Sequence, residues 1–259
     1  MNTPADRRRS QIMALLDNQR SVRMGDVSAQ LGIPVATVRR DLAVLDDLGL
    51  LKLSRYGAVA IPHYRTSKEH SARMNLNREK KERIGRAAAG LIQVGERIIL
   101  DAGTTPLQVA RHICSDLRLS GALTLYTSSI PIFREIGSCP GIRLVLLGGI
   151  YLPDYESLAG PQTVEIVKDI QADKVFMGAD GITLTNGITT ADILEADVDR
   201  AILQASREVI VVADSSKIGV IGLVSLIQLE KVHKLVTDLD APLHFMEAVR
   251  ALGVEVILA

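Results

Sequence analysis

The sequence predicts an α/β protein in two parts: a small helical unit at the N-terminus, followed by a larger domain with a mainly parallel sheet. Three short helical patterns occupy the start of the chain, whereas apolar runs alternate with helical segments beyond residue 95. A chain of 259 residues, 47% of them hydrophobic, is long enough to bury one large core and one small one. We therefore assign residues 1–62 to a first domain, 63–83 to a linker and 84–259 to a second domain.

The charge of the chain is divided between these parts. Lysine and arginine number 30, as do aspartate and glutamate, so the formal net charge is +0. Residues 1–86 nevertheless hold 17 basic and 9 acidic side chains, and the remainder holds 13 and 21. A basic part joined to an acidic part is typical of a polyanion-binding module on a body that need not touch the polyanion, although a solvated basic surface has the same composition.

Several other classes of protein are not supported. The basic N-terminus is followed by no signal-peptide-like apolar stretch, and no apolar run approaches membrane-spanning length, so we expect a cytoplasmic protein. Cys114 and Cys139 lack the spacing of a zinc site or of a disulfide framework, and the five histidines are scattered. We expect packing cysteines, no metal and no cofactor.

The first part is predicted to be a helix-turn-helix unit. Between the second and third helices, Gly32 suits a left-handed turn and Pro34 suits the first turn of the helix that follows. The apolar residues recur at helical spacing in three groups, which are Ile12, Leu15 and Leu16, then Met24, Val27 and Leu31, then Val35, Val38, Leu42 and Leu45.

The third helix carries candidate DNA contacts away from its apolar stripe. At about 100° per residue, Ala36 and Arg40 lie opposite the stripe, Thr37 lies next to them and Arg39 lies at the flank. The Arg40 fork matches guanine O6 and N7 in the major groove, whereas Arg39 is better placed for phosphate. The alternative is an arginine pair on a solvated face, which the tight helix-Gly-Pro-helix spacing disfavours.

A two-stranded wing and a linker are predicted next. Residues 50–62, LLKLSRYGAVAIP, alternate around a glycine, and Lys52 and Arg55 in this wing are expected to contact phosphates. Residues 63–83 are polar and basic, with no apolar period before Ile84. The basic residues at the end of this linker could contact the DNA backbone or be solvated at a helix start.

The second part alternates apolar runs with helices. Runs buried on both faces between helices predict a mainly parallel sheet, in which ligands bind outside the carboxyl ends of the strands. The apolar runs are 97–102, 122–127, 142–149, 174–180, 208–214, 234–238 and 254–259, and the helical segments are 106–115, 161–171, 191–206 and 242–252.

The first strand end, LDAGTTPLQVA, has the composition of an anion site. Gly103 allows close approach of backbone, Thr105 can cap the helix and Pro106 suits its first turn. The amides of such a helix start can hold a phosphate, although many strand-to-helix turns need Gly and Thr for backbone reasons alone.

Four further strand ends, YTSS, LLGG, MGADG and ADSSK, carry similar residues. Lys217 adds a positive charge to this set, and Asp101, Asp180 and Glu195 add groups that accept hydrogen bonds from hydroxyls. A polyol that bears a phosphate fits this inventory.

Both parts of the sequence resemble the DeoR family of bacterial transcription regulators. The stretch VATVRRDLAVLDDLGLLKLSRYGAV is similar to the family's winged helix-turn-helix, but without the Ser or Thr that usually caps the second and third helices. The ordered segments LDAGTT, GG, GADGI, EADVDRAIL and DSSKIG resemble its sensor domain, whose fold is similar to sugar-phosphate isomerases and coenzyme A transferases.

The resemblance implies an effector pocket, with Thr104 and Thr105 nearest the phosphate. Ser128 and Ser129 stand where the family often has asparagine, and Ser215 stands where it frequently has histidine, so the sugar itself is not implied. The residues implied to line the pocket are Asp101, Gly103, Thr104, Thr105, Thr127, Ser128, Gly148, Gly149, Asp180, Glu195 and Lys217.

Two functions follow. The first is a repressor of a sugar or polyol operon that binds a DNA operator, forms a dimer or tetramer through residues 84–259, and responds to a phosphorylated sugar. The alternative is a sugar-phosphate isomerase or deaminase with an appended head, with Asp101, Asp180 or Glu195 as the base. The head favours regulation, because an enzyme has no need for arginines that read a groove.

Overall fold

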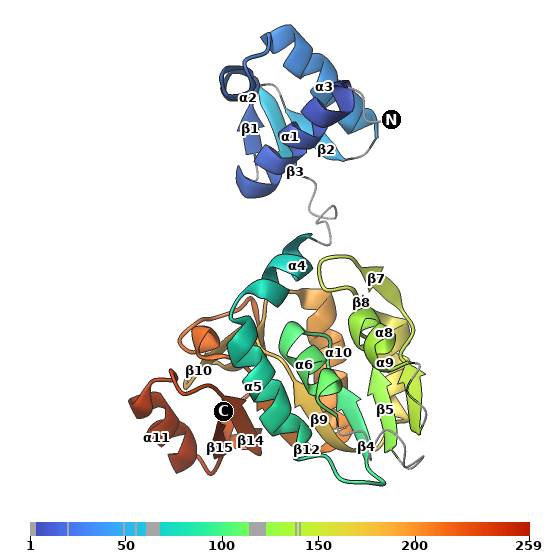
Figure 1. Ribbon diagram of the computed structural model, residues 1–259, viewed down its shortest axis with the longest axis vertical. Helices are drawn as coiled ribbons and strands as arrows, with labels where there is room; N and C mark the ends of the chain where they lie inside the picture. The colour runs from blue at the N-terminus through green and yellow to red at the C-terminus, as the bar shows by residue number, and fades with distance from the viewer. Residues whose placement is uncertain are drawn as a thin grey trace. The chain divides into compact units, whose positions relative to one another are not determined.

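The computed structural model describes residues 4–19, 21–48, 50–54, 56–60, 68–113, 123–137, 139 and 141–259. Contacts between residues divide the chain into two units, residues 1–66 and 67–259, which we call the head and the body (Figure 1).

The described part of the head consists of three helices and a small antiparallel sheet. The helices are α1 (Pro4–Gln19), α2 (Met24–Leu31) and α3 (Val35–Asp47), and the strands are β1 (Ser21–Arg23), β2 (Leu51–Ser54) and β3 (Gly57–Ala60), in the order β1-β3-β2. The predicted helices and wing are confirmed. The short strand β1 was not predicted, and it pairs with β3 to make the sheet three-stranded.

The apolar stripes of the three helices meet in one core. It includes Ile12 from α1, Val27 from α2 and Leu42 from α3, all buried. Val35 is an exception to the predicted stripe: it is 47% exposed, because it is the first residue of α3 and the stripe meets the core only from the next turn. Gly32 is left-handed, as predicted, whereas Pro34 precedes α3 instead of lying in its first turn. No side chain caps α2 or α3, as the sequence predicted.

A seven-stranded parallel sheet forms the centre of the body. Its strands are β4 (Arg97–Leu100), β5 (Leu123–Thr127), β6 (Ile142–Leu146), β9 (Ala172–Met177), β12 (Ser206–Val212), β14 (Lys234–Thr237) and β15 (Glu255–Leu258). Their order is β15-β14-β12-β9-β4-β5-β6, and every pairing among them is parallel. The predicted sheet is confirmed, because each strand falls on one predicted apolar run.

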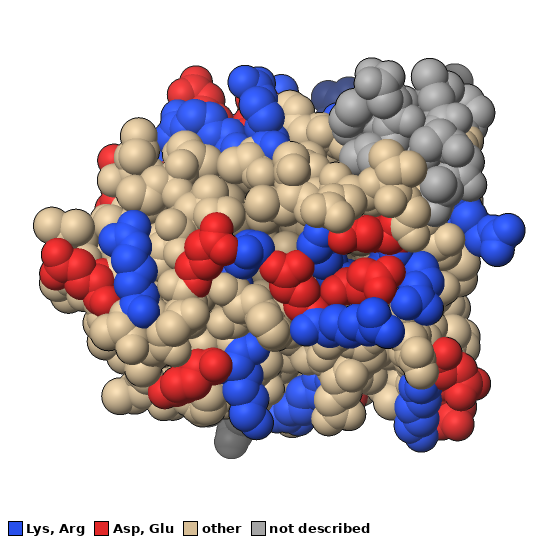
Figure 2. All heavy atoms as spheres, turned by 90° about the horizontal axis from the view of Figure 1, so that it is seen from below, with Lys and Arg blue, Asp and Glu red and all other residues tan. Residues whose placement is uncertain are grey.

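The amino ends of these strands are joined by ion pairs. Arg97 at the start of β4 contacts Asp173 of β9 at 3.1 Å, and Lys174 contacts Glu96 at 2.5 Å. Oppositely charged side chains are likewise interspersed on the face drawn in Figure 2. The charges of these groups are paired with one another at the amino ends, and ligands of parallel α/β sheets bind at the carboxyl ends.

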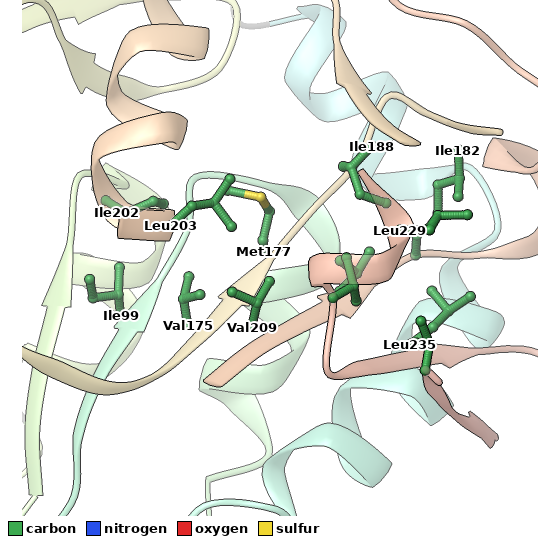
Figure 3. Close-up of a cluster of buried hydrophobic side chains, with 14 of the residues drawn as sticks. Ile99, Val175, Met177, Ile182, Ile188, Ile202, Leu203, Val209, Leu229 and Leu235 are labelled. Carbon is green, nitrogen blue, oxygen red and sulfur yellow. The ribbon is translucent and has the colours of Figure 1, made fainter. Parts of the chain in front are cut away.

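Helices cover both faces of the sheet. The first face is covered by α5 (Arg78–Ala89), α6 (Thr104–Arg111) and α8 (Ile130–Ile136), and the second by α9 (Pro161–Lys168), α10 (Ile193–Gln204) and α11 (Leu243–Ala251). Successive residues of β4 point to opposite faces: Ile98 joins the core under α5 and α6, whereas Ile99 joins the core under α10. Figure 3 shows Ile202 and Leu203 of α10 in this second core.

Smaller elements surround the carboxyl ends of the sheet. They are α4 (Lys68–Asn75), the antiparallel hairpin β7 (Ile150–Leu152) and β8 (Ser157–Ala159), the antiparallel sheet β10 (Gly181–Thr183), β11 (Gly187–Thr190) and β13 (Val224–Ile227), and the single turn η1 (Ser215–Lys217). A second single turn, η2 (Leu229–Lys231), directly precedes β14. Ile182 and Ile188 anchor the small sheet in the second core (Figure 3). Among the described residues, no helix is long and apolar enough to cross a membrane.

The segment assigned to a linker contains helical structure. Residues 68–75 form α4, and α5 begins at Arg78 instead of near Ile84. The apolar period starts late because the first turn of α5 meets polar loops, while its later turns pack on α6. At that contact a Cβ on Gly85 would lie 2.5 Å from the Cβ of Gln108.

The order of the strands creates a crevice between β4 and β9. From β4 the chain passes through α6 to β5 on one side, and from β9 it continues to β12 on the other side. Where neighbouring parallel strands lead away in opposite directions, the loops at their carboxyl ends separate and leave room for a ligand.

Candidate functional site

Helix α3 presents the predicted DNA contacts to solvent. Ala36, Arg39 and Arg40 are exposed and Thr37 is half-buried, whereas Val38 on the other side of the helix is buried. Lys52 in the wing has a side chain that is 74% exposed and lies 3.9 Å from Asp46. Arg55 lies outside the described residues.

Other arginines of the head have a structural role. Arg8 and Arg9 on α1 both bind the carboxylate of Asp41 on α3, Arg9 at 3.2 Å. Burial alone would raise the pKa of Asp41, but the hydrogen bonds and charges of Arg8 and Arg9 outweigh it and lower that pKa. Arg8 and Arg9 therefore fix α1 against α3 through Asp41.

A cavity of the body opens at the crevice between β4 and β9. It is lined by the loops after β4, β9 and β12, by the small sheet, by α10 and by α4 and α5. Seven of the residues implied by the family resemblance line it, namely Asp101, Gly103, Thr104, Thr105, Asp180, Glu195 and Lys217.

One wall of the cavity is the start of α6. Gly103 has an extended backbone and precedes the helix, and Thr104 and Thr105 are its first two residues. Thr105 was predicted to cap this helix, which is wrong, because it is the second residue of α6, two positions past Gly103, which takes the cap position. Within the described residues neither threonine amide donates to another group, so both are available to an anion.

Three cations line the same cavity. They are Lys217 from η1, which lies 4.0 Å from Asp180, together with Lys81 of α5 and Arg73 of α4. Lys81 is buried and donates to the backbone oxygen of Arg73 at 2.6 Å. Burial lowers the pKa of Lys81, and the nearby Asp214 opposes this. Among the described residues, the hydrogen-bond partner of the Lys81 ammonium is this neutral backbone carbonyl of Arg73, so an anion bound in the cavity would stabilise the buried charge.

The first turn of α5 holds these groups in place. Asn77 donates to Asp214 at 2.9 Å, and Lys80 lies 3.0 Å from the buried Asp238 and 2.8 Å from Asp240. Lys80 and Lys81 therefore take neither of the two roles considered from the sequence, DNA contact or solvated charge. Lys80 joins α5 to the loops that follow β12 and β14, and Lys81 joins α5 to α4.

Buried acidic side chains lie in the same cavity as the three cations. Glu195 and Asp199 lie one turn apart on α10, next to Asp101 at the end of β4. Ser157 of the β7–β8 hairpin donates to Glu195 at 3.1 Å. Burial, and then the charge of Asp101, raises the pKa of both α10 carboxyls well above their ordinary values.

Asp101 connects the two sides of the crevice. Its carboxylate accepts from the amides of Ala102 at 2.6 Å and Gly178 at 3.0 Å, and it is hydrogen-bonded to Asp199. Burial raises the pKa of Asp101 from 3.8 to about 7, despite the opposing effect of these hydrogen bonds. Near neutral pH the group therefore shares protons, and it can both donate to and accept from hydroxyls of a ligand.

This proton sharing predicts a pH dependence of stability. Asp101 binds its proton more tightly in the folded chain, so its contribution is complete at low pH and is lost as the pH rises from about 4 to about 7. Asp199→Asn keeps a neutral partner for Asp101 but removes one titrating group, so it should flatten the decline. In urea unfolding at pH 5 and pH 7, we expect a difference from wild type of about 1.4 kcal/mol per pH unit for each proton involved.

Asp197→Asn is the matched control, because Asp197 lies on the same helix with a side chain that is 67% exposed. It should leave the decline unchanged. An equal decline in wild type and Asp199→Asn would show that the carboxyls do not share protons.

Four residues implied by the resemblance do not line the cavity. Thr127 accepts from the amide of Ser129, and Ser128 accepts from the amide of Leu158. Gly148 accepts from Thr163, and a Cβ on Gly149 would lie 2.1 Å from the Oγ1 of Thr163. These positions build the backbone around the β7–β8 hairpin and α9.

Several residues that line the cavity were missed from the sequence. Asp199 could have been found, because it lies four residues after Glu195 on one helix face. Lys81 and Arg73 lie in the stretch assigned to the linker, where nothing distinguishes them from neighbouring basic residues. Tyr155 lies in the turn between β7 and β8, where no feature of the sequence indicated a ligand site.

A helix-turn-helix that presents arginines, joined to an α/β unit with a polar cavity, is typical of a regulator of transcription. Two family models match the chain: residues 8–63 match the DeoR-like helix-turn-helix domain and residues 76–239 match the DeoR C terminal sensor domain. The chain belongs to the DeoR family and is a DNA-binding transcriptional regulator.

Named relatives are similar over almost the whole chain. The putative aga operon transcriptional repressor of Escherichia coli O157:H7 is 32% identical over 258 residues, which cover 99% of this chain and 94% of the relative. The transcriptional repressor AccR of Agrobacterium fabrum is 34% identical over 232 residues, which cover 89% and 88%. Among solved structures, ribose 5-phosphate isomerase A from Methanocaldococcus jannaschii has a TM-score of 0.41 with 19% identity over 55% of each chain, too slight a likeness to support an argument.

Proposed function

We propose that this DeoR-family regulator represses a sugar or polyol operon and that a phosphorylated sugar bound in the body changes its affinity for the operator. The observation that carries the proposal is the composition of the cavity, in which a free helix start and three cations lie together with buried carboxyls. The names of two similar proteins, the aga operon repressor and AccR, describe repressors, which supports the same direction of control.

The two sets of groups match the two halves of such a ligand. A phosphate is accepted by the amides of Thr104 and Thr105 and by Lys217 and Lys81, because charge-assisted hydrogen bonds to phosphate are strong. The sugar hydroxyls, which both donate and accept, suit the carboxyls on the other side of the site.

Thermal unfolding of the full chain tests this proposal. A panel of pentose and hexose phosphates is compared with the same sugars lacking phosphate and with inorganic phosphate. A ligand at 100 times its Kd stabilises the folded state by about 2.7 kcal/mol, so one or a few phosphorylated sugars should raise the Tm clearly. No shift with any phosphorylated sugar would contradict the proposal.

Catalysis is the second candidate function, and the carboxyls of the cavity are the observation that favours it. Asp101, Glu195 and Asp199 have raised pKa values of the kind that general bases need. We propose that the body binds the sugar phosphate without converting it, because a DNA-binding regulator needs an effector site but no catalysis. Incubation of the same panel with the protein should leave each sugar phosphate unchanged by NMR, and conversion of any of them would establish an enzyme.

We also propose that the body joins two or four copies, so that paired heads read repeated half-sites in the cytoplasm. A single winged helix reads only a short site, so useful specificity calls for more than one head. The body offers exposed apolar side chains for such contacts, including Ile193, Ile221 and Leu223. Sedimentation at micromolar concentration should give a dimer or tetramer, and a monomer that binds its operator fully would contradict this.

A further inference from the structure

Arg73 occupies a distinctive place in the body. It lies on α4, the first helix of the body after the segment 61–67 that leads from the head. Its side chain lines the effector cavity together with Leu76, which directly follows α4. The helix nearest in sequence to the head thus contributes to the wall of the ligand site.

The contacts of Arg73 connect three elements. Its guanidinium lies 4.4 Å from the centre of the Tyr155 ring and donates to the backbone oxygen of Asp154, both in the turn between β7 and β8. Its own backbone oxygen accepts from the ammonium of Lys81 on α5. Because Tyr155 also lines the cavity, α4, the hairpin turn and the start of α5 meet at the ligand site through this one residue.

One hydrogen-bond donor of the Arg73 side chain has no acceptor among the described residues. The Nε atom is buried, and within the described part of the chain it has no hydrogen-bond partner. A buried donor without an acceptor costs free energy, which an acceptor brought by a ligand would recover. The charges of Arg73 and Lys217 both act on Lys81, so these three cations share one region of the cavity, where an anion would meet them.

We propose that Arg73 binds the anionic group of the effector directly, and that this contact holds α4 on the occupied cavity and so passes occupancy to the segment that leads into the head. The inference rests on the proposed function and adds the route of regulation to it. The ligand needs no contact with the DNA-reading arginines. The ligand changes the preferred position of α4, which follows the segment that leads from the head. The size of this effect is set by how much more tightly the ligand binds one position of α4 than another.

The test uses the full chain and the phosphorylated sugar that gives the largest thermal shift with wild type. Arg73→Met keeps an apolar stem beside Tyr155 but removes the charge and every donor. We expect its Kd for that sugar phosphate to rise about ten- to hundredfold, the loss for a charge-assisted hydrogen bond. Amide hydrogen exchange of residues 68–76 should slow on ligand addition in wild type, and it should not change in Arg73→Met even at saturating ligand.

Two further variants separate the role in binding from a role in folding. Arg78→Met is the matched control, because Arg78 is an arginine at the start of α5 with a side chain that is 64% exposed. It should leave the Kd and the exchange response as in wild type. Arg73→Lys restores the charge without the planar fork, so it should recover part of the affinity, which a purely structural defect would not.

The possible outcomes are distinct. If wild type binds a sugar phosphate and Arg73→Met binds it with the same Kd and the same protection of residues 68–76, the inference is wrong while the proposed function stands. If no phosphorylated sugar binds to wild type, the proposed function fails and the inference fails with it.

Discussion

Arg40→Ala is expected to weaken specific operator binding about ten- to hundredfold, which corresponds to about 1 to 3 kcal/mol. Arg40 is exposed on α3, on the side away from the buried Val38 and Leu42. It is also not used in the ion pair that joins α1 to α3, which involves Arg8 and Arg9. Its loss should therefore remove a base contact without disturbing the core of the head.

The measurement compares an operator, selected by the wild-type protein from a random DNA pool, with a scrambled duplex over a series of salt concentrations. Arg40→Ala should lose affinity for the operator and relax its preference at one base pair. Lys52→Ala is the control, because a phosphate contact should weaken both duplexes alike and reduce the salt slope by about 1. Unchanged operator affinity in Arg40→Ala would remove this residue from the DNA-reading face.

The fold could be predicted because burial on both faces leaves a clear trace in sequence. The strands β4, β9 and β12 at the centre of the sheet each contain an apolar run, since residues such as Ile98 and Ile99 enter cores on opposite faces. The fold of the head could also be predicted, because each of its helices has one buried apolar stripe and Gly32 marks the turn between α2 and α3.

The cavity could be predicted only in part. Asp101, Thr104 and Lys217 follow strands or begin helices, so the rule for parallel sheets places them together. Arg73 and Lys81 come from helices that cross the same edge, and that placement depends on tertiary packing. The sequence does not distinguish a basic side chain that faces water from one that faces a cavity when its neighbours are also basic. Arg73 and Lys81 were therefore assigned to the linker and not to the ligand site.

Gly148 and Gly149 were implied to line the effector pocket, but neither of them lines the cavity described above. Their position after β6 resembles a ligand loop. In the structure the carbonyl of Gly148 accepts from Thr163 of α9, and a Cβ on Gly149 would lie 2.1 Å from the Oγ1 of Thr163. A glycine required for close approach of backbone looks the same in sequence whether the neighbour is a ligand or another helix.

Lys217→Glu is expected to abolish the response to the effector while operator binding is retained. Lys217 lines the cavity and shares its region with Lys81, so a carboxylate there would repel a phosphate from the start of α6. DNA affinity with and without a saturating sugar phosphate should then differ less than twofold, on the order of 0.4 kcal/mol. Lys231→Glu is the matched control, because Lys231 also ends a single helical turn but is exposed and outside the cavity.

Thr104→Trp should have the same effect by bulk instead of charge. Thr104 is half-buried at the mouth of the cavity, so a larger side chain can fill the ligand space without entering the core of the sheet. Gln162→Trp, near the start of α9 and exposed, places the same ring at a helix start away from the site. Because coupling is reciprocal, each cavity variant should also lose the change in sugar-phosphate affinity that DNA causes in wild type. If both cavity variants respond at wild-type ligand concentrations, the effector binds elsewhere in the chain.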